Sequence, residues 1–76
     1  MNNIIVYSTK SCPYCVMAKE YLNSKSIAFE DVDVSEDMTR AMEMVRKSGQ
    51  QGVPVLDVNG EIIIGFNKQA IDSALK

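Results

Sequence analysis

Residues 7–15, YSTKSCPYC, decide the fold of this chain, because they carry it from a strand through a polar loop into a helix. The residues just before, 4–7 with the sequence IIVY, are β-branched or aromatic and predict a buried strand. Pro13 suits the first turn of a helix, since the N–H that it lacks would be unpaired there, and good helix formers continue to about Lys25. Cys12 is therefore predicted at or beside the N-cap of this helix.

The only two cysteines of the chain are Cys12 and Cys15. Residues three apart on a helix are neighbours, with Cβ atoms about 5 to 6 Å apart, so the pair can form a disulfide with modest adjustment of the first turn. A disulfide that closes so short a loop removes only about 2 kcal/mol of chain entropy, against about 4.7 kcal/mol for a hundred-residue loop. The pair is a poor structural cross-link, and we predict that it performs redox chemistry.

The two cysteines are expected to have different roles. The unpaired N–H groups of the helix start and the nearby Lys10 stabilise a thiolate on Cys12. Cys15 shares a helical stripe with Ala18 and Leu22 that faces the sheet. Cys12 is therefore predicted to attack the substrate, and Cys15 to resolve the mixed disulfide.

Two other uses of the pair fit the sequence less well. A zinc site needs four ligands, and the chain has two Cys and no His, so a metal or iron-sulfur site would need a second chain or added thiols. A pair of inert thiols is hard to reconcile with Pro13 and a helix start at that place. We therefore predict no metal site in the single chain.

The middle of the chain predicts a strand and a helix. Residues 27–34 form the strand, placed at a sheet edge because its acidic residues leave neither face apolar. The helix begins with Ser35 as its cap and ends at Gly49, and its charges match the helix dipole: Glu36 and Asp37 in the first turn, Arg46 and Lys47 in the last. Its apolar stripe is interpreted as core rather than as a partner site: Met38, Ala41, Met42 and Val45.

The last third of the chain predicts a hairpin and a helix. Residues 55–58 and 61–64 flank Asn59-Gly60, which tolerates the positive φ of a type I′ turn. Asn67 can cap a last helix that directs Ala70, Ile71, Ala74 and Leu75 to the core. The order of elements predicts one α/β domain over residues 1–76, a four-stranded mixed sheet with three helices packed on it.

Composition excludes several classes of function. A net charge of −2 supplies no basic field for nucleic acid. No apolar run approaches the ~20 residues that cross a bilayer, and the N-terminus lacks the pattern of a signal peptide. We expect a cytoplasmic monomer that binds neither nucleic acid nor membrane.

Residues 7–15 resemble the active-site segment of the glutaredoxin family, and the resemblance spans the whole chain. The Cys-Pro-Tyr-Cys centre is that of the dithiol glutaredoxins. Gly52-Val53-Pro54 falls where the family has Thr-Val-Pro, and Gly65-Phe66-Asn67 falls where it has Gly-Gly and an Asp. The resemblance implies a thioredoxin fold with sheet order 2-1-3-4, and a cis peptide bond before Pro54 that packs against the cysteines.

The resemblance also implies a binding site for glutathione. Lys10 matches the basic residue that meets the glycine carboxylate, Tyr14 matches the active-site tyrosine, and Val53 beside Pro54 supplies backbone hydrogen bonds. From the residues alone, a solvated loop lysine is the less favoured alternative for Lys10.

Phe66 and Asn67 depart from the family pattern. Asn67 is neutral where the family has an acid for the γ-glutamyl ammonium, and Phe66 replaces a glycine that lets the ligand approach the backbone. These two departures predict weaker glutathione binding.

The resemblance implies an enzyme that reduces protein disulfides and glutathione mixed disulfides, with glutathione as co-substrate. Two alternatives stay open. Electrons can come from thioredoxin reductase instead, or two chains can carry an iron-sulfur cluster ligated by Cys12 and glutathione, which the stiff Pro13 disfavours. Expected partners include glutathionylated proteins and ribonucleotide reductase.

Overall fold

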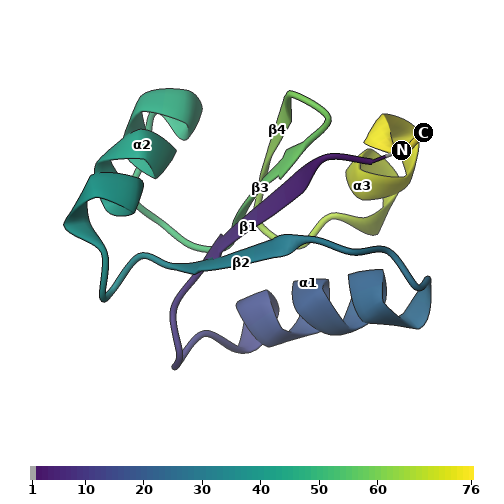
Figure 1. Ribbon diagram of the computed structural model, residues 1–76, viewed down its shortest axis with the longest axis horizontal. Helices are drawn as coiled ribbons and strands as arrows, with labels where there is room; N and C mark the ends of the chain where they lie inside the picture. The colour runs from purple at the N-terminus through teal and green to yellow at the C-terminus, as the bar shows by residue number, and fades with distance from the viewer. Residues whose placement is uncertain (1) are drawn as a thin grey trace.

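The computed structural model describes residues 2–76 as a four-stranded sheet with three helices (Figure 1). The elements in chain order are β1 (Ile4–Ser8), α1 (Pro13–Ser24), β2 (Glu30–Asp33), α2 (Met38–Ser48), β3 (Val55–Val58), β4 (Glu61–Ile64) and α3 (Lys68–Ala74). The strands lie in the order β2-β1-β3-β4; β1 and β2 are parallel, and the other pairs are antiparallel. The predicted mixed sheet, its strand order and the edge position of β2 are confirmed.

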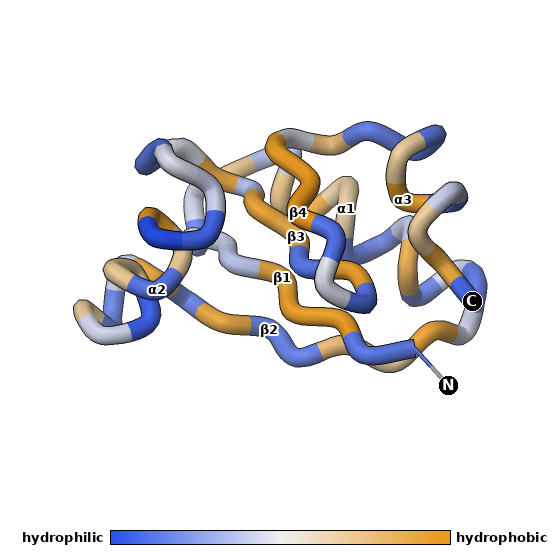
Figure 2. The backbone as a smooth tube through the Cα atoms, turned by 90° about the horizontal axis from the view of Figure 1, so that it is seen from above, coloured by the Kyte–Doolittle hydropathy of each residue, from blue (hydrophilic) through white to orange (hydrophobic). Residues whose placement is uncertain are grey.

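The helices divide between the two faces of the sheet. α1 and α3 cover one face, where alternate residues of β1 and β3 build the larger core cluster: Ile4, Val6, Ala18, Leu22, Leu56, Val58, Ile63 and Ile71. α2 covers the other face with a smaller cluster of Tyr7, Val32, Met44 and Val55. Figure 2 shows β1 and β3 as largely hydrophobic segments in the middle of the molecule.

Two predicted boundaries in the middle of the chain are wrong. β2 begins at Glu30 rather than at residue 27, and α2 begins after Asp37 rather than after Ser35. The Asp33 carboxylate accepts hydrogen bonds from the backbone N–H and the hydroxyl of Ser35, at 2.9 and 2.5 Å, and this holds Ser35 in a turn. Asp37 becomes the N-cap, since its carboxylate accepts the Arg40 N–H at 3.2 Å.

The interpretation of the α2 methionines as core is also wrong. Met38 and Met42 are 76% and 56% exposed, and only Met44, which the predicted stripe omitted, is buried. Met44 lies roughly a third of a turn from the centre of the predicted stripe, so burying it rotates Met38 and Met42 toward solvent, while Val45 still packs against the core.

Polar residues hold α2 in this rotation. The fully buried ring of Tyr7 on β1 carries a hydroxyl that donates to Glu43 and accepts from Lys47 Nζ at 2.9 Å. Lys47 also donates to Asp57 on β3 at 2.8 Å, and Arg40 donates to Glu30 on β2 at 2.9 Å. We call the residues Tyr7, Arg40, Glu43, Lys47 and Asp57 the polar clamp.

The predicted turns and caps of the last third are confirmed. Asn59 and Gly60 have φ of 56° and 91°, as a type I′ turn requires, and Asn67 Oδ1 accepts the Ala70 N–H at 3.1 Å as the cap of α3. Of the four residues predicted to face the core on α3, Ile71 is fully buried and the others are partly buried. Every helix within residues 2–76 is too short or too polar to span a lipid bilayer.

Candidate active site

Cys12 is the N-cap of α1. Its extended backbone, with φ of −98° and ψ of 108°, turns the chain into the helix, and Pro13 occupies the first helical position as predicted. The Cys15 N–H donates to Cys12 Sγ over 3.1 Å. The sulfur therefore lies at the positive end of the helix dipole with a backbone N–H aimed at it. The structure thus places Cys12 at the start of α1, as the sequence predicts.

Cys15 lies one turn further along α1 and is completely buried, like Ala18 and Leu22. The two cysteines are free thiols and form no disulfide. Burial, followed by the contact with Cys12, raises the pKa of the Cys15 thiol to about 12. Cys15 therefore keeps its proton near neutral pH, and Cys12 is the more accessible of the two thiols. The burial of Cys15 is as the helical stripe predicts.

The loop before β3 brings a second segment to Cys12. The Val53–Pro54 peptide bond is cis, as the resemblance predicts, and the Cys12 thiol donates to the Val53 carbonyl over 3.8 Å. The buried Pro54 is tied to the end of β4, because its carbonyl accepts the Gly65 N–H at 2.9 Å. Residues 41 positions apart thus meet, with backbone polar groups beside the reactive sulfur.

Lys10 and Tyr14 flank the cysteines on exposed positions. The Lys10 side chain is 78% exposed and forms an ion pair of 2.5 Å with Glu36, in the turn before α2. Tyr14 is 61% exposed on the first turn of α1. Both side chains are accessible to a ligand, and the Lys10 ammonium already has a carboxylate partner.

The side chains of Phe66 and Asn67 both contact other residues of the chain. The Phe66 ring packs edge-on against Tyr21 of α1, with centroids 5.9 Å apart. The Asn67 side chain caps α3 through Ala70. Within residues 2–76, neither forms a hydrogen bond to the cysteine pair.

A polar cluster on the α1 side of the sheet escaped sequence analysis. The buried Ser8 hydroxyl donates to Asp31 at 3.0 Å, and Lys19 Nζ donates to Ser8 at 3.3 Å and to Asp31 at 3.0 Å. The Lys19 charge lowers the pKa of Cys15 and so offsets part of the effect of burial. The spacing of Cys15 and Lys19, four residues on one helix, was the available signal.

Metal binding has no visible site in the part of the chain that the structure describes. Residues 2–76 contain no group of three or more His, Cys, Asp or Glu side chains that could hold a metal ion.

Comparisons with known proteins agree on one family. The glutaredoxin family model matches residues 4–63. An uncharacterized glutaredoxin-like 8.6 kDa protein in the rubredoxin operon of Clostridium pasteurianum is 51% identical over 73 residues, covering 96% of this chain and 97% of that protein. Glutaredoxin 3 of Escherichia coli strain K12 is 32% identical over 65 residues, covering 86% of this chain and 78% of that protein.

A solved structure agrees with the sequence relatives. The crystal structure of a thioredoxin-like protein, 29% identical, superposes with a TM-score of 0.88 and covers 95% of this chain and 99% of that one. The likeness therefore extends over the whole fold, including both segments that meet at Cys12.

Proposed function

This chain belongs to the glutaredoxin family, and on that premise we propose that it reduces protein disulfides and glutathione mixed disulfides through Cys12 and Cys15. One observation carries the proposal. Cys12 caps α1 with a backbone N–H on its sulfur, whereas Cys15 is buried and has a raised pKa. A site with one activated thiol and one protected thiol is suited to attack followed by resolution.

The proposed reaction has two exchange steps. The Cys12 thiolate attacks one substrate sulfur, a disulfide between Cys12 and the substrate forms, and the second substrate sulfur leaves as a thiolate that takes up a proton. Cys15 then gives up its proton, its sulfur attacks that of Cys12, and the first substrate sulfur leaves and is protonated. The substrate gains two electrons, and the chain ends with a Cys12–Cys15 disulfide.

Glutathione is the proposed source of the returning electrons. Two glutathione thiols reduce the Cys12–Cys15 disulfide and leave as one glutathione disulfide, which keeps atoms and electrons balanced. The proposed contacts with glutathione are the Lys10 ammonium, Tyr14, and the backbone of Val53 beside Pro54. Phe66 and Asn67 complete the proposed glutathione site. We place this activity in the cytoplasm, where thiol reductants keep such a pair reduced.

A dithiol reductase of the thioredoxin reductase class is the second candidate donor. The observation that favours it is the engagement of the glutathione-binding positions within the chain: Lys10 pairs with Glu36, Phe66 packs on Tyr21, and Asn67 caps α3. A protein donor needs access to Cys12 and the Val53 backbone but no carboxylate or ammonium contact at these positions.

A turnover assay with both donors in parallel tests the proposal. We expect glutathione to support turnover, more slowly than it does for a dithiol glutaredoxin with Asp in place of Asn67. Screening limits an exposed ion pair to about 0.2–1 kcal/mol, so Asn67→Asp should raise the glutathione-dependent rate by no more than about fivefold. Turnover with the reductase alone would assign the donor to the second candidate, and no turnover with either would contradict the proposed function.

Single cysteine variants test the two roles. Cys12→Ser should abolish all exchange, whereas Cys15→Ser should trap mixed disulfides with protein substrates and keep activity on glutathionylated ones, which need one thiol. Mass spectrometry detects the trapped species. Equal loss of activity in both variants on glutathionylated substrates would contradict the assignment.

A further inference from the structure

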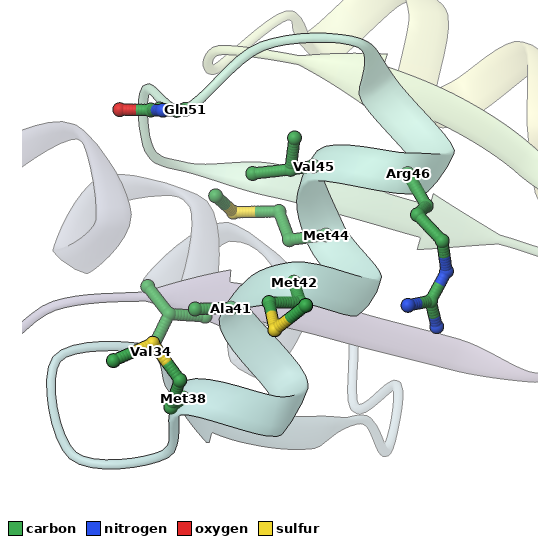
Figure 3. Close-up of a pocket in the computed structure, with 8 residues that line it drawn as sticks. All are labelled: Val34, Met38, Ala41, Met42, Met44, Val45, Arg46 and Gln51. Carbon is green, nitrogen blue, oxygen red and sulfur yellow. The ribbon is translucent and has the colours of Figure 1, made fainter.

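The outer face of α2 carries an apolar groove that the redox chemistry leaves unused. It has a volume of about 560 Å³ and is lined by Val34, Met38, Ala41, Met42, Met44, Val45, Arg46 and Gln51. Figure 3 shows Val34, Met38 and Ala41 gathered near the start of the helix and Gln51 on the loop that follows it. Six of the eight lining residues have aliphatic or thioether side chains, so the groove suits an apolar side chain.

Only the inner part of this groove serves the packing of the fold: Met44 belongs to the smaller core cluster, and Val34 and Val45 pack against it. The polar clamp attaches α2 through Arg40, Glu43 and Lys47, which lie on the side of the helix opposite to Met38 and Met42. Met38 and Met42 remain more than half exposed. Two large apolar side chains that lie this close together in water indicate a surface that contacts another molecule.

The groove is continuous with the surroundings of Cys12. Gln51 at its edge is two residues from Val53, whose carbonyl lies 3.8 Å from Cys12 Sγ. Val34, at another edge, donates its N–H to the Ser8 carbonyl at 2.9 Å, at the point where β1 enters the active-site loop. Two chain segments thus connect the groove to the surroundings of Cys12, and the two residues from Gln51 to Val53 span about 6.6 Å when extended.

Arg46 gives one edge of the groove a positive charge. Arg46 is the only charged residue that lines it, and within residues 2–76 Arg46 takes part in no ion pair. The other two cations of α2, Arg40 and Lys47, are both engaged by carboxylates of the sheet. An acidic group on the occupant would complement Arg46, which lies one helical turn beyond Met42.

We propose that this groove binds the protein substrate of the redox site, taking a large apolar side chain two or three residues from the reactive cysteine and an acidic residue beyond it. The proposal rests on the proposed function and adds a substrate class to it. Methionine side chains are flexible and polarizable, so Met38 and Met42 can adapt to different apolar residues. The groove thus selects substrates by pattern rather than by one exact sequence.

A single-turnover assay tests the proposal without any electron donor. A cysteine peptide is joined by a disulfide to thionitrobenzoate; when Cys12 attacks the peptide sulfur, thionitrobenzoate leaves and its colour reports the rate, and Cys15 then displaces the peptide thiol. One peptide carries Leu and then Glu on both sides of its cysteine. In two matched peptides Ser replaces Leu, or Gln replaces Glu, and the same disulfide of free cysteine serves as the small substrate.

Surface variants assign the preference to the groove. We expect the Leu peptide to react about tenfold faster than the Ser peptide, since a half-buried Leu contributes on the order of 1.4 kcal/mol. The double variant Met38→Ser/Met42→Ser should lose this preference and keep its rate on the small substrate. Met17→Ser, which changes an exposed methionine of α1, is the matched control and should behave as the unmodified chain. Arg46→Gln should remove a two- to fivefold preference for Glu over Gln.

The assay separates a failure of the groove proposal from a failure of the proposed function. Equal rates for the Leu and Ser peptides, or a preference that survives in the double variant, would overturn the groove proposal while a normal rate on the small substrate leaves the proposed function standing. No reaction with the small substrate would defeat the proposed function and the groove proposal with it. A dimer by sedimentation that the double variant dissociates would assign the groove to a second copy of the chain, which also overturns the proposal.

Discussion

The two faces of the sheet hold their helices by different means. On one face, α1 and α3 bury a cluster of eight apolar residues, of which only Ile4 and Ile63 retain any exposed surface. On the other face, α2 buries Met44 alone and is fastened through the polar clamp. The first face is held mainly by the hydrophobic effect, and the second by oriented hydrogen bonds and ion pairs around a buried tyrosine ring.

The difference has a functional consequence. A helix held by its apolar side commits that side to the core, whereas a helix held by polar side chains can turn its apolar side outward. α1 belongs to the first kind, and it keeps Cys15 dry and protonated. α2 belongs to the second kind and leaves Met38 and Met42 more than half exposed.

The largest expected effect is a truncation in the apolar face. Leu56→Ala removes a fully buried side chain between α1 and β3 and should lower the free energy of unfolding by about 2–5 kcal/mol. Urea unfolding followed by circular dichroism measures it. A loss below about 1 kcal/mol would show that this face is less tightly packed than its burial indicates.

A smaller effect is expected from loosening the polar clamp. Tyr7→Phe keeps the ring and removes only the hydroxyl, so Lys47 retains Asp57 and Glu43 retains Arg40. The expected loss is about 1–2 kcal/mol, typical of a buried hydrogen-bonded group. The same urea titration measures it, and a loss as large as that of Leu56→Ala would erase the proposed contrast between the faces.

Acid should weaken the α2 face selectively. The hydrogen bond from Tyr7, followed by the charges of Arg40 and Lys47, lowers the pKa of Glu43 below its ordinary value of 4.5. A carboxyl whose pKa is lowered on folding stabilises the protein above the unfolded pKa, and this contribution disappears as the pH falls through the folded pKa. Amide exchange in α2 should therefore accelerate below about pH 4.5 more than exchange in α1. In Glu43→Gln this acceleration should shrink, and an unchanged pH response there would contradict the assignment to Glu43.

The smallest effect belongs to the exposed methionines. Met42→Ser should change the free energy of unfolding by no more than about 0.5 kcal/mol, because its side chain is already in water. Urea unfolding with Met44→Ser as the buried counterpart measures the contrast. A loss above about 1.5 kcal/mol in Met42→Ser would mean that Met42 packs on the fold and is not free to receive a substrate.

Local signals along the chain were sufficient to predict most of the fold and the position of Cys12 at the start of α1. Pro13 sets the start of α1 and so the position of Cys12, and Asn59-Gly60 sets the hairpin, because each acts through its own backbone. The cap of α2 was misplaced because both Ser35 and Asp37 are good caps, and the choice between them depends on a turn that Asp33 closes. Competing local signals of equal strength are resolved only by their surroundings.

The chemistry of the chain was readable from the order of its residues, because a strand, a loop, two cysteines three apart and a helix start involve neighbours along the backbone. The rotation of α2 was decided by tertiary structure. Hydrophobic patterning treats Arg40, Glu43 and Lys47 as the solvent side of the helix, whereas Tyr7 and Asp57, brought together by the pairing of β1 and β3, offer those charges better partners than water does. Since these partners lie far apart in sequence, no local pattern could show that Met38 and Met42 would be turned outward.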